Sequence, residues 1–314
     1  MAACCAPGGG RGVGPEPAAS SAVPAGAGAH QFVSLAGGEF SMGSDGSSAY
    51  ADDGEGPVHL VELSAFAIDA HAVTNDHFGA FVSATGHVTE AERFGWSFVF
   101  GGLLPDDFEE TRGVAAAPWW RQVYGATWRH PEGPQSTLDG RGQHPVIHVS
   151  WHDAVAYCSW RGVRLPSEAE WEHAARGGLA GARFPWGDEL EPEGRHLMNV
   201  FQGTFPNGNT LEDGYAGPAP VDAFPANGYG LHNMTGNVWE WCSDWFDPGA
   251  YQHHVREDPT GPASGTHRVM RGGSYLCHES YCRRYRVSAR SANSPDASTG
   301  NLGFRVVAAA TARD

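Results

Sequence analysis

Cys277 and Cys282 lie five residues apart in the sequence. Neither a regular helix nor a regular strand could bring their two side chains together. A helix would separate them by more than a quarter turn, and a strand would send them to opposite faces. The backbone must therefore bend between them if the two thiols are to meet. Gly272 and Gly273 lie just upstream and give the chain the freedom for such a bend. The sequence predicts an irregular loop that carries two sulfurs.

Positive charge surrounds this pair, and it is expected to favour the thiolate form of the cysteines. Three kinds of site remain open from the spacing: a structural disulfide, a zinc site completed by His278, and a redox or soft-metal site. A zinc site usually needs a second pair of cysteines or histidines, and the sequence offers none at a matching spacing. The zinc site is therefore the least favoured. The surrounding cations are Arg271, Arg283, Arg284 and Arg286.

Longer blocks of sequence carry a family resemblance. Residues 271–286, RGGSYLCHESYCRRYR, together with residues 289–305, ARSANSPDASTGNLGFR, closely resemble the signature of formylglycine-generating enzymes, also called sulfatase-modifying factors. The resemblance extends from Phe32 to Ala308 and indicates a bacterial, actinobacterial member. Four further blocks agree: GGEFSMGS from Gly37, HPVIHVSWHDAVAYCSW from His144, RLPSEAEWEHAARGG from Arg164 and GNVWEWCSDWF from Gly236.

The order of the predicted elements, with early strands, two short helices, long loops and late strands, is compatible with an α+β fold with little regular secondary structure and many loops. Glycine occurs 43 times, proline 21 times and tryptophan 11 times, which suits turns and loops held in place by aromatic side chains. The family resemblance adds a C-type-lectin-like topology. Residues 1–30 are rich in Gly, Pro and Ala without a secretory signal, so they are predicted to form a disordered tail. Residues 31–310 are predicted to form a single catalytic domain.

Local patterns predict several short elements. Residues 30–44 alternate as two strands joined by a glycine turn, residues 58–73 have strand character, and residues 75–84 show helical spacing. Ser150 and Ser167 each open a helix through a capping box, and Gly177 ends the second helix. Residues 93–139 show no periodicity and are expected to be irregular; late strands are expected in HRVMRGGSY and LGFRVVAA. The inward positions of the first strands are predicted to be Phe32, Val33, Leu35, Phe40 and Met42.

Charge and cysteine usage limit the partners and the compartment. A net charge of −16 argues against nucleic acid and anionic membranes, which attract basic surfaces. The sequence also lacks a long apolar run that would span a membrane, so a cytoplasmic protein is expected, and we also expect it to be a monomer. Vertebrate members of the family have two disulfides, and three of the four matching positions here are Ala175, Val287 and Val306. The fourth, Cys158, is expected to be a buried free thiol, and Cys242 a core residue.

The resemblance implies a copper- and oxygen-dependent oxidase that converts the cysteine of a C-x-P-x-R motif in an unfolded sulfatase to formylglycine. Cu(I) is a soft ion that prefers thiolate ligands, so Cys277 and Cys282 are the implied copper ligands. Two further residues would line the oxygen and thiol site, and two would contact the substrate peptide. From the residues alone, each of these four could equally be a core or turn residue. They are Ser274 and Asn301 for the first pair, and Trp239 and Tyr281 for the second.

Two structural calcium ions are also implied by the resemblance. Calcium binds carboxylate, amide and carbonyl oxygens, which glycine-rich loops can offer. Without the family these would be ordinary loop residues, because no EF-hand spacing is present. One site would use Asn199, the Val200 carbonyl, Asp213 and the Tyr215 carbonyl, and the other would use Asn233, Gly236, Val238 and Glu240.

One departure from the family concerns substrate recognition. Trp96 stands where animal relatives have an aspartate that pairs with the substrate arginine. Its ring could instead stack on the guanidinium through a cation–π interaction of about 0.5–2 kcal/mol. Two other functions remain as alternatives. A related non-haem iron sulfoxide synthase normally carries an additional histidine-rich helical domain, and a non-enzymatic binding module of the same fold lacks the cysteine pair.

Overall fold

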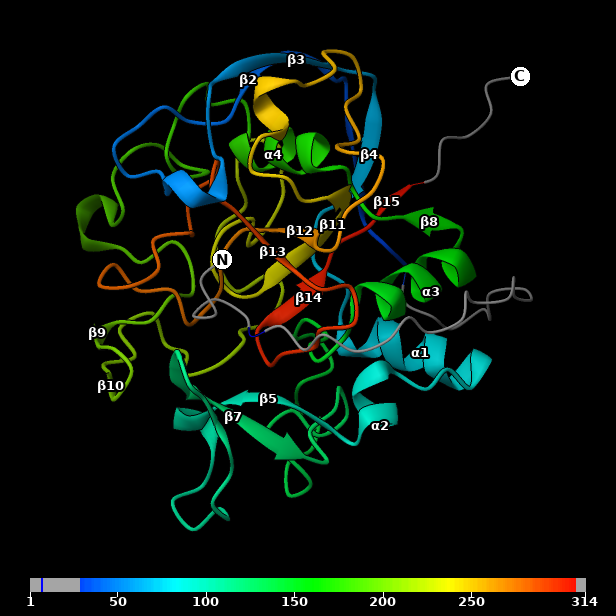
Figure 1. Cartoon of the computed structure of the whole chain (residues 1–314), viewed down its shortest axis with the longest axis vertical. Coiled ribbons are helices and arrows are strands. Elements are labelled where there is room, and N and C mark those ends of the chain that lie inside the picture. The colour runs from blue at the N-terminus through cyan, green and yellow to red at the C-terminus, as the bar shows by residue number, and fades with distance from the viewer. Residues whose placement is uncertain (1–6, 8–28, 309–314) are drawn as a thin grey trace.

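The computed structural model describes residue 7 and residues 29–308, and it has the predicted mixture of short helices, short strands and long loops (Figure 1). The predicted tail lies almost wholly outside the described residues, so the boundaries at residues 30 and 310 stay predictions. The α-helices in this range are α1 (Asn75–Thr85), α2 (Glu90–Phe94), α3 (Trp151–Arg161) and α4 (Glu168–Arg176). Short 3-10 turns are η1 (Ala51–Asp53), η2 (Gly101–Leu103), η3 (Pro192–Gly194) and η4 (Ala250–Gln252).

A mixed sheet in the middle of the molecule supports the cysteine loop. Its strand order is β13-β12-β11-β14, and β11 pairs with β14 in parallel but with β12 in antiparallel orientation. The cysteine loop leaves the end of β12, and the segment before β14 returns beside it (Figure 1). The bounds are β11 (Trp239–Trp245), β12 (Arg268–Arg271), β13 (Arg290–Asn293) and β14 (Leu302–Phe304).

Smaller antiparallel sheets surround this one. Figure 1 shows the β2–β3 hairpin at the top of the view and the sheet that contains β5 and β7 at the bottom. One sheet has the order β1 (Phe32–Leu35), β4 (Phe66–Asp69), β15 (Val307–Ala308) and β8 (Val163–Arg164). Another has the order β5 (Trp96–Phe100), β7 (Ala117–Tyr124) and β6 (Gly113–Val114). The two-stranded pairs are β2 (Gly38–Met42) with β3 (His59–Leu63), and β9 (Gly203–Thr204) with β10 (Gly208–Asn209).

The predicted helix starts are confirmed because they depend on local chemistry. The Ser150 side chain accepts from the Asp153 backbone N–H, and the Asp153 carboxylate accepts from the Ser150 N–H, which completes a capping box at α3. The same reciprocal bonds link Ser167 and Glu170 at α4. Gly177 ends α4 in the left-handed conformation, as predicted.

Other expectations were wrong or incomplete. Phe32 was expected to point inward, but it is 37% exposed on strand β1. Residues 93–139 were expected to be irregular, yet they contain the end of α2 and the three-stranded sheet, which is held by pairings such as Trp96 with Tyr124. The first two strands also belong to different sheets, because β1 pairs with β4 and β2 pairs with β3. The strand differences arise from pairing between segments that are distant in the sequence.

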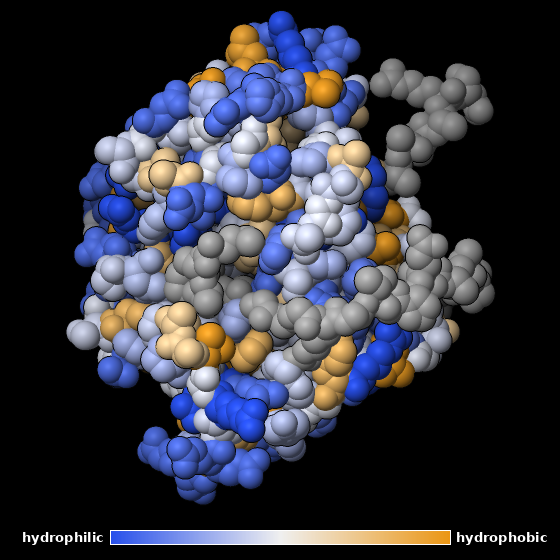
Figure 2. Space-filling model, in the orientation of Figure 1, coloured by the Kyte–Doolittle hydropathy of each residue, from blue (hydrophilic) through white to orange (hydrophobic). Residues whose placement is uncertain are grey.

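Two large hydrophobic clusters form the core. One lies among α1, α3 and β11 and contains both Cys277 and Cys282, and the other packs α4 against β2 and β3. The coloured part of the surface in Figure 2 is mostly hydrophilic, with apolar residues scattered among polar ones. Within the described residues, no helix combines the length and apolar character needed to span a membrane.

Candidate active site

The cysteine loop bends at two glycines and then at a short turn. Gly272 and Gly273 have φ values of +96° and +75°, which only glycine adopts readily. A Cβ on Gly273 would also lie 2.9 Å from the Arg284 carbonyl oxygen, so a side chain has no room there. The Cys282 N–H then donates to the His278 carbonyl oxygen at 2.8 Å. This turn carries the chain back so that the two cysteines meet, as the sequence predicts.

The two sulfurs lie 3.1 Å apart, and both cysteines are buried. A disulfide bond would be about 2.05 Å long, so no disulfide joins them. Burial is the main cause that raises the pKa of the Cys277 thiol well above its usual range, and contact with Cys282 adds to it. The Ser274 backbone N–H at 3.4 Å from the Cys277 sulfur opposes this only in part. Arg284 does lower the pKa of Cys277, as expected from the nearby positive charge, but burial outweighs it and the net shift of this pKa is upward.

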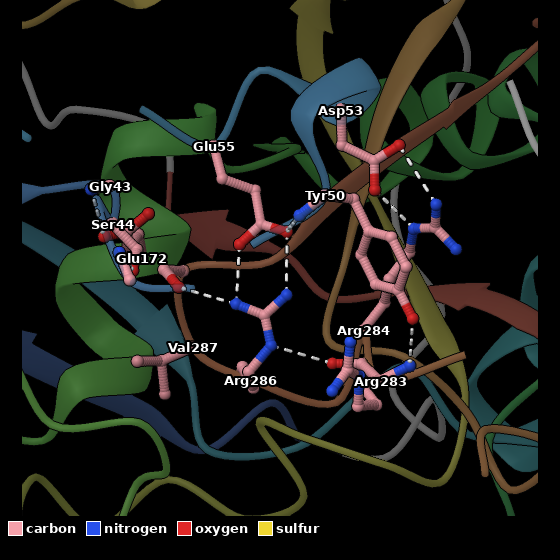
Figure 3. Close-up of polar contacts among 12 residues, drawn as sticks. Gly43, Ser44, Tyr50, Asp53, Glu55, Glu172, Arg283, Arg284, Arg286 and Val287 are labelled. Atoms are coloured by element: carbon pink, nitrogen blue, oxygen red, sulfur yellow. Dashed lines mark hydrogen bonds and ion pairs between the residues drawn. The ribbon is translucent and has the colours of Figure 1, made fainter. Parts of the chain in front are cut away.

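The arginines of this stretch are largely engaged with carboxylates from distant parts of the chain. Figure 3 shows Asp53 and Glu55, from one short segment, facing Arg284 and Arg286. Arg284 donates to both carboxylate oxygens of Asp53 and lies 4.1 Å from the centre of the Tyr50 ring. Its Nη1 lies 4.0 Å from the Cys282 sulfur. Arg286 binds both oxygens of Glu55 at 2.6 and 2.7 Å.

Arg271 is neutralised in the same way beneath the loop. It is fully buried, and it donates to Glu168 at 3.0 Å and to Glu172. A buried charge is tolerated only when it is paired and hydrogen-bonded, and these carboxylates meet that requirement. The ion pairs therefore anchor the cysteine loop to α4 and to the segment around η1.

Ser274 and Asn301 meet beside the sulfurs. The Asn301 side-chain amide donates to the Ser274 hydroxyl oxygen at 2.9 Å, and the Thr299 hydroxyl donates to the Asn301 carbonyl oxygen at 2.8 Å. All three side chains are buried. The structure thus brings together the two residues predicted to line the oxygen and thiol site, while their roles stay predictions.

The three predicted peptide contacts occupy different environments. Tyr281 is half-buried and stacks on Phe205 with ring centres 4.0 Å apart. Trp96 is also half-buried, and its strand β5 reaches the site through the hydrogen bond from Gly300 N–H to the Phe98 carbonyl oxygen at 2.8 Å. Trp239 is fully buried in the same cluster as the two cysteines, so it presents no surface for a peptide contact in this structure. Its expected contact with the peptide is therefore unsupported and stays a prediction.

His148 supports the site and was missed by sequence reasoning. It is completely buried with φ +58°, and its ring nitrogens contact the Ser97 hydroxyl and the Pro131 carbonyl oxygen, both at 2.8 Å. Its backbone N–H donates to the Thr299 carbonyl oxygen at 3.1 Å, which steadies the turn before Asn301. Burial lowers the pKa of His148 to about 4, so the ring is neutral near pH 7. Nothing in its sequence context separates it from the other histidines.

The first predicted calcium site has converging oxygen ligands. The Asp213 carboxylate accepts the Val200 N–H at 3.0 Å and the Tyr215 N–H at 2.9 Å. The side-chain oxygen of Asn199 is buried and has no hydrogen-bond partner within residues 29–308. An unsatisfied buried acceptor carries a free-energy penalty that a cation would relieve. These oxygens suit a hard cation such as Ca²⁺, but the Gln202 amide donates to the Val200 carbonyl and to Asp213 at 2.9 Å and would have to give way to the cation.

The second predicted calcium site fits less well. Asn233 likewise has a buried side-chain oxygen that no described group satisfies, while its amide donates to the Val221 carbonyl oxygen at 3.0 Å. Glu240, however, already accepts from Arg305 at 2.9 and 3.1 Å and from the Trp171 indole at 2.8 Å. Glu240 would have to share its carboxylate between Arg305 and the cation. Gly236 and Val238 complete this predicted set and lie in the segment that leads into β11.

The structure is thus a loop-rich α+β fold with a buried pair of cysteines that no disulfide joins. An irregular loop that carries two sulfurs is what the sequence predicts. Residues 19–310 match the family model described as the sulfatase-modifying factor enzyme 1-like domain. The chain therefore belongs to the sulfatase-modifying factor family, and the predicted family and fold are confirmed.

The most similar relatives include two enzymes from actinobacteria. The formylglycine-generating enzyme of Streptomyces coelicolor is 60% identical over 274 residues, covering 87% of each chain. The formylglycine-generating enzyme of Thermomonospora curvata is 57% identical over 281 residues, covering 88% of this chain and 93% of the relative. Among solved structures, PvdO from Pseudomonas aeruginosa matches with a TM-score of 0.63 at 24% identity, covering 88% of this chain and 93% of PvdO. The likeness to PvdO concerns the fold alone.

Proposed function

We propose that this protein is a copper- and oxygen-dependent oxidase that converts the cysteine of a C-x-P-x-R motif in an unfolded sulfatase to Cα-formylglycine. The observation that carries the proposal is the buried pair of Cys277 and Cys282, with sulfurs 3.1 Å apart and no disulfide between them. Family membership and relatives named formylglycine-generating enzymes support the reaction class.

The two sulfurs would hold Cu(I). Two converging thiols suit a soft ion, and within the described residues no group of three or more His, Cys, Asp or Glu side chains could hold a metal. Copper, when bound, would supply the activation of oxygen and the oxidation of the substrate thiol. Cys277 must lose its proton for this, because a thiolate is the ligand form. Arg284 beside Cys282 supplies a positive charge close to the resulting anionic sulfurs.

The surrounding side chains would position the substrate. Asn301 orients the Ser274 hydroxyl, and the Ser274 N–H donates to the Cys277 sulfur, so this pair would shape the place where the substrate thiol enters. Tyr281 would offer an aromatic face to the peptide, and Trp96 would stack on the substrate arginine. The net change removes two hydrogens from the substrate cysteine, at Cβ and sulfur. Oxygen accepts these together with two electrons and two protons from the thiol reductant and is reduced to two molecules of water. Water then replaces the sulfur to give the aldehyde and hydrogen sulfide.

A peptide assay tests this function directly. The protein is incubated with a C-x-P-x-R peptide, Cu(I), oxygen and a thiol reductant, and mass spectrometry detects the loss of sulfur and the gain of an aldehyde. Copper should support turnover and zinc should not. An inert protein would favour the binding-module alternative. Sulfoxide formation with iron and a thiol-histidine substrate would favour the sulfoxide-synthase alternative.

We further propose that the protein is a monomer and that it is located in the cytoplasm, where thiols stay reduced. Cys158 and Cys242 are both buried and unbonded, and burial raises the pKa of each thiol above its usual range. Cell fractionation together with size-exclusion chromatography tests the compartment and the oligomeric state.

A further inference from the structure

A second site is suggested by a cavity of about 340 Å³ beneath the loop that follows η4. Elements from the whole chain meet there, because its walls come from the β2–β3 hairpin, the first turn of α4, the end of β11 and the loop 253–262. None of the lining residues belongs to the cysteine loop at residues 271–286. In Figure 1 this region lies around η4 near the top of the view, where the surface in Figure 2 is largely hydrophilic. The lining side chains used below are His59, Glu168, Asp244, Tyr251 and His254.

Two buried side chains on the wall of this cavity have an acceptor atom without a partner. Asp244 is 4% exposed; its Oδ2 accepts the Glu168 N–H at 2.9 Å and the Ser243 hydroxyl at 3.0 Å, whereas Oδ1 accepts no hydrogen bond from any described residue. His59 is 9% exposed, and its Nδ1 donates to the Pro57 carbonyl oxygen at 2.9 Å. Burial lowers the pKa of His59, so the neutral ring leaves Nε2 as an acceptor, and no described group donates to it. Both atoms can therefore accept a hydrogen bond from a ligand in the cavity, and because neither is among the fully buried atoms that lack a partner, both are accessible from the cavity.

The lining of the cavity is negative overall, because Glu168, Asp244, Asp247 and Asp258 outnumber the one lining arginine, Arg290. Arg290 pairs with Glu168 at 2.6 Å, and Arg271, which is not part of the lining, pairs with Glu168 at 3.0 Å, so the excess negative charge comes from the three aspartates. Asp244 has no such ion pair. Burial, followed by repulsion from Glu168, raises the pKa of Asp244 to about 7. A cation in the cavity would favour the charged carboxylate and supply the missing donors. Asp247 and Asp258 also line this cavity and are exposed, so they would disfavour a ligand that carries a carboxylate.

The aromatic side chains of the wall favour a cation that can stack. The His59 ring centre lies 4.5 Å from the Tyr251 ring and 4.1 Å from the His254 ring, with the rings tilted by 56° and 44°. The Arg290 guanidinium already lies 4.4 Å from the centre of the Tyr251 ring, so His59 and the exposed His254 are the aromatic groups open to a ligand. A guanidinium is planar, stacks on aromatic faces and carries several N–H donors in a fixed fork, whereas an ammonium is a compact, strongly hydrated point charge. A metal ion is disfavoured because the described residues include no cluster of three or more suitable ligands.

We propose that this cavity binds a guanidinium group, which donates hydrogen bonds to Asp244 Oδ1 and His59 Nε2 and lies against the aromatic wall. The guanidinium can belong to a small free amine or to an arginine side chain of a polypeptide. The proposal is independent of the oxidase function, because the cavity shares no residue with the cysteine loop.

Calorimetric titration of the full chain at pH 8 tests the proposal. Agmatine represents the free guanidinium, N-acetyl-arginine amide represents the peptide arginine, and 1,5-diaminopentane is the matched amine without a guanidinium. At least one guanidinium probe should bind more tightly than the diamine, and which of the two binds identifies the source. Asp244→Asn should weaken that binding by about tenfold or more, because a charge-assisted hydrogen bond is lost.

The exposed Asp247→Asn is the matched control and should change the affinity only slightly. Folding of both variants is checked by circular dichroism and by the formylglycine assay, which neither substitution should affect. No guanidinium binding at millimolar concentration, a preference for the diamine, or equal affinity in wild type and a folded Asp244→Asn would overturn the proposal.

Discussion

Asp53 and Arg284 are separated by 231 residues in the chain, yet they form a buried ion pair at the edge of the candidate active site. The Asp53 carboxylate accepts from one side of the guanidinium, and the remaining nitrogen, Nη1, lies 4.0 Å from the Cys282 sulfur. The Tyr50 ring covers its face at 4.1 Å. The position of Arg284 beside the cysteine pair is therefore set by the segment around η1.

Asp53→Asn should destabilise the protein because it leaves the Arg284 charge buried without a full counter-charge. Breaking a buried ion pair from one side typically costs roughly 3 kcal/mol in the free energy of unfolding. The measurement is urea denaturation at pH 7. Asp52→Asn is the matched control, because Asp52 is adjacent but exposed, and it should change stability by no more than about 0.5 kcal/mol. Equal effects of the two substitutions would show that the ion pair contributes nothing specific.

Serine substitutions should distinguish the proposed copper ligands, Cys277 and Cys282, from the buried core thiol of Cys158. Cys277→Ser and Cys282→Ser should each abolish aldehyde formation in the peptide assay, because a hydroxyl is a poor ligand for a soft ion. Cys158→Ser should stay active and instead lose about 1–3 kcal/mol of stability, since its hydroxyl would be buried among apolar neighbours. An active Cys277→Ser or Cys282→Ser enzyme would refute the two-thiolate copper site while leaving the oxidase assignment in place.

The enzyme should tolerate replacement of the substrate arginine, because Trp96 stands in place of a carboxylate. Aromatic stacking discriminates less sharply than a carboxylate, so peptides with arginine, lysine or alanine at that position should differ modestly in kcat/KM. The variant Trp96→Asp should discriminate more steeply in favour of arginine. If wild type and Trp96→Asp show the same rate ratios, Trp96 does not contact the side chain at the arginine position of the substrate.

Removal of calcium should lower the melting temperature, because a ligand that binds only the folded state stabilises it. A strong chelator should have this effect on the wild-type protein. Asn199→Ala should reduce the effect of the chelator, since it removes the buried oxygen that lacks a partner. Asn207→Ala, at an exposed position in a neighbouring loop, is the control. An unchanged wild-type melting temperature with chelator would rule structural calcium out.

Acid should destabilise the protein in part through His148. Burial holds the pKa of His148 at about 4, below the value near 6.5 of an unfolded histidine, so the unfolded state binds the proton first. The stability contributed by the neutral ring is present above pH 6.5 and is lost as the pH falls toward 4, by up to about 1.4 kcal/mol per pH unit.

His148→Asn is the variant for this measurement, because asparagine tolerates the positive φ of this position. Its free energy of unfolding should fall less steeply than that of the wild type between pH 6.5 and 4.5. His77 also has a pKa lowered to about 4, but it is present in both proteins and cancels in the comparison. Parallel pH profiles would assign the acid sensitivity to other groups.

Features that depend on neighbouring residues could be predicted from the sequence. The caps at Ser150 and Ser167 each need only an acidic residue three positions on, and Gly177 needs only freedom of its own backbone. The bend between the two cysteines follows from their spacing and from the glycines before them. The family blocks then indicated the fold and the class of reaction.

Only the tertiary structure decided which groups meet across the chain. The charge of Arg284 and Arg286 was visible in the sequence, but their neutralisation by Asp53 and Glu55 was not, because ion-pair partners are chosen by folding and not by spacing. For the same reason the strand that begins at Trp96 was missed, since its pairing partner lies beyond an irregular loop. The sequence by itself determined where the thiols are and that they could meet. Burial in the folded core decided that Cys277 holds its proton, because a thiolate loses its hydration there.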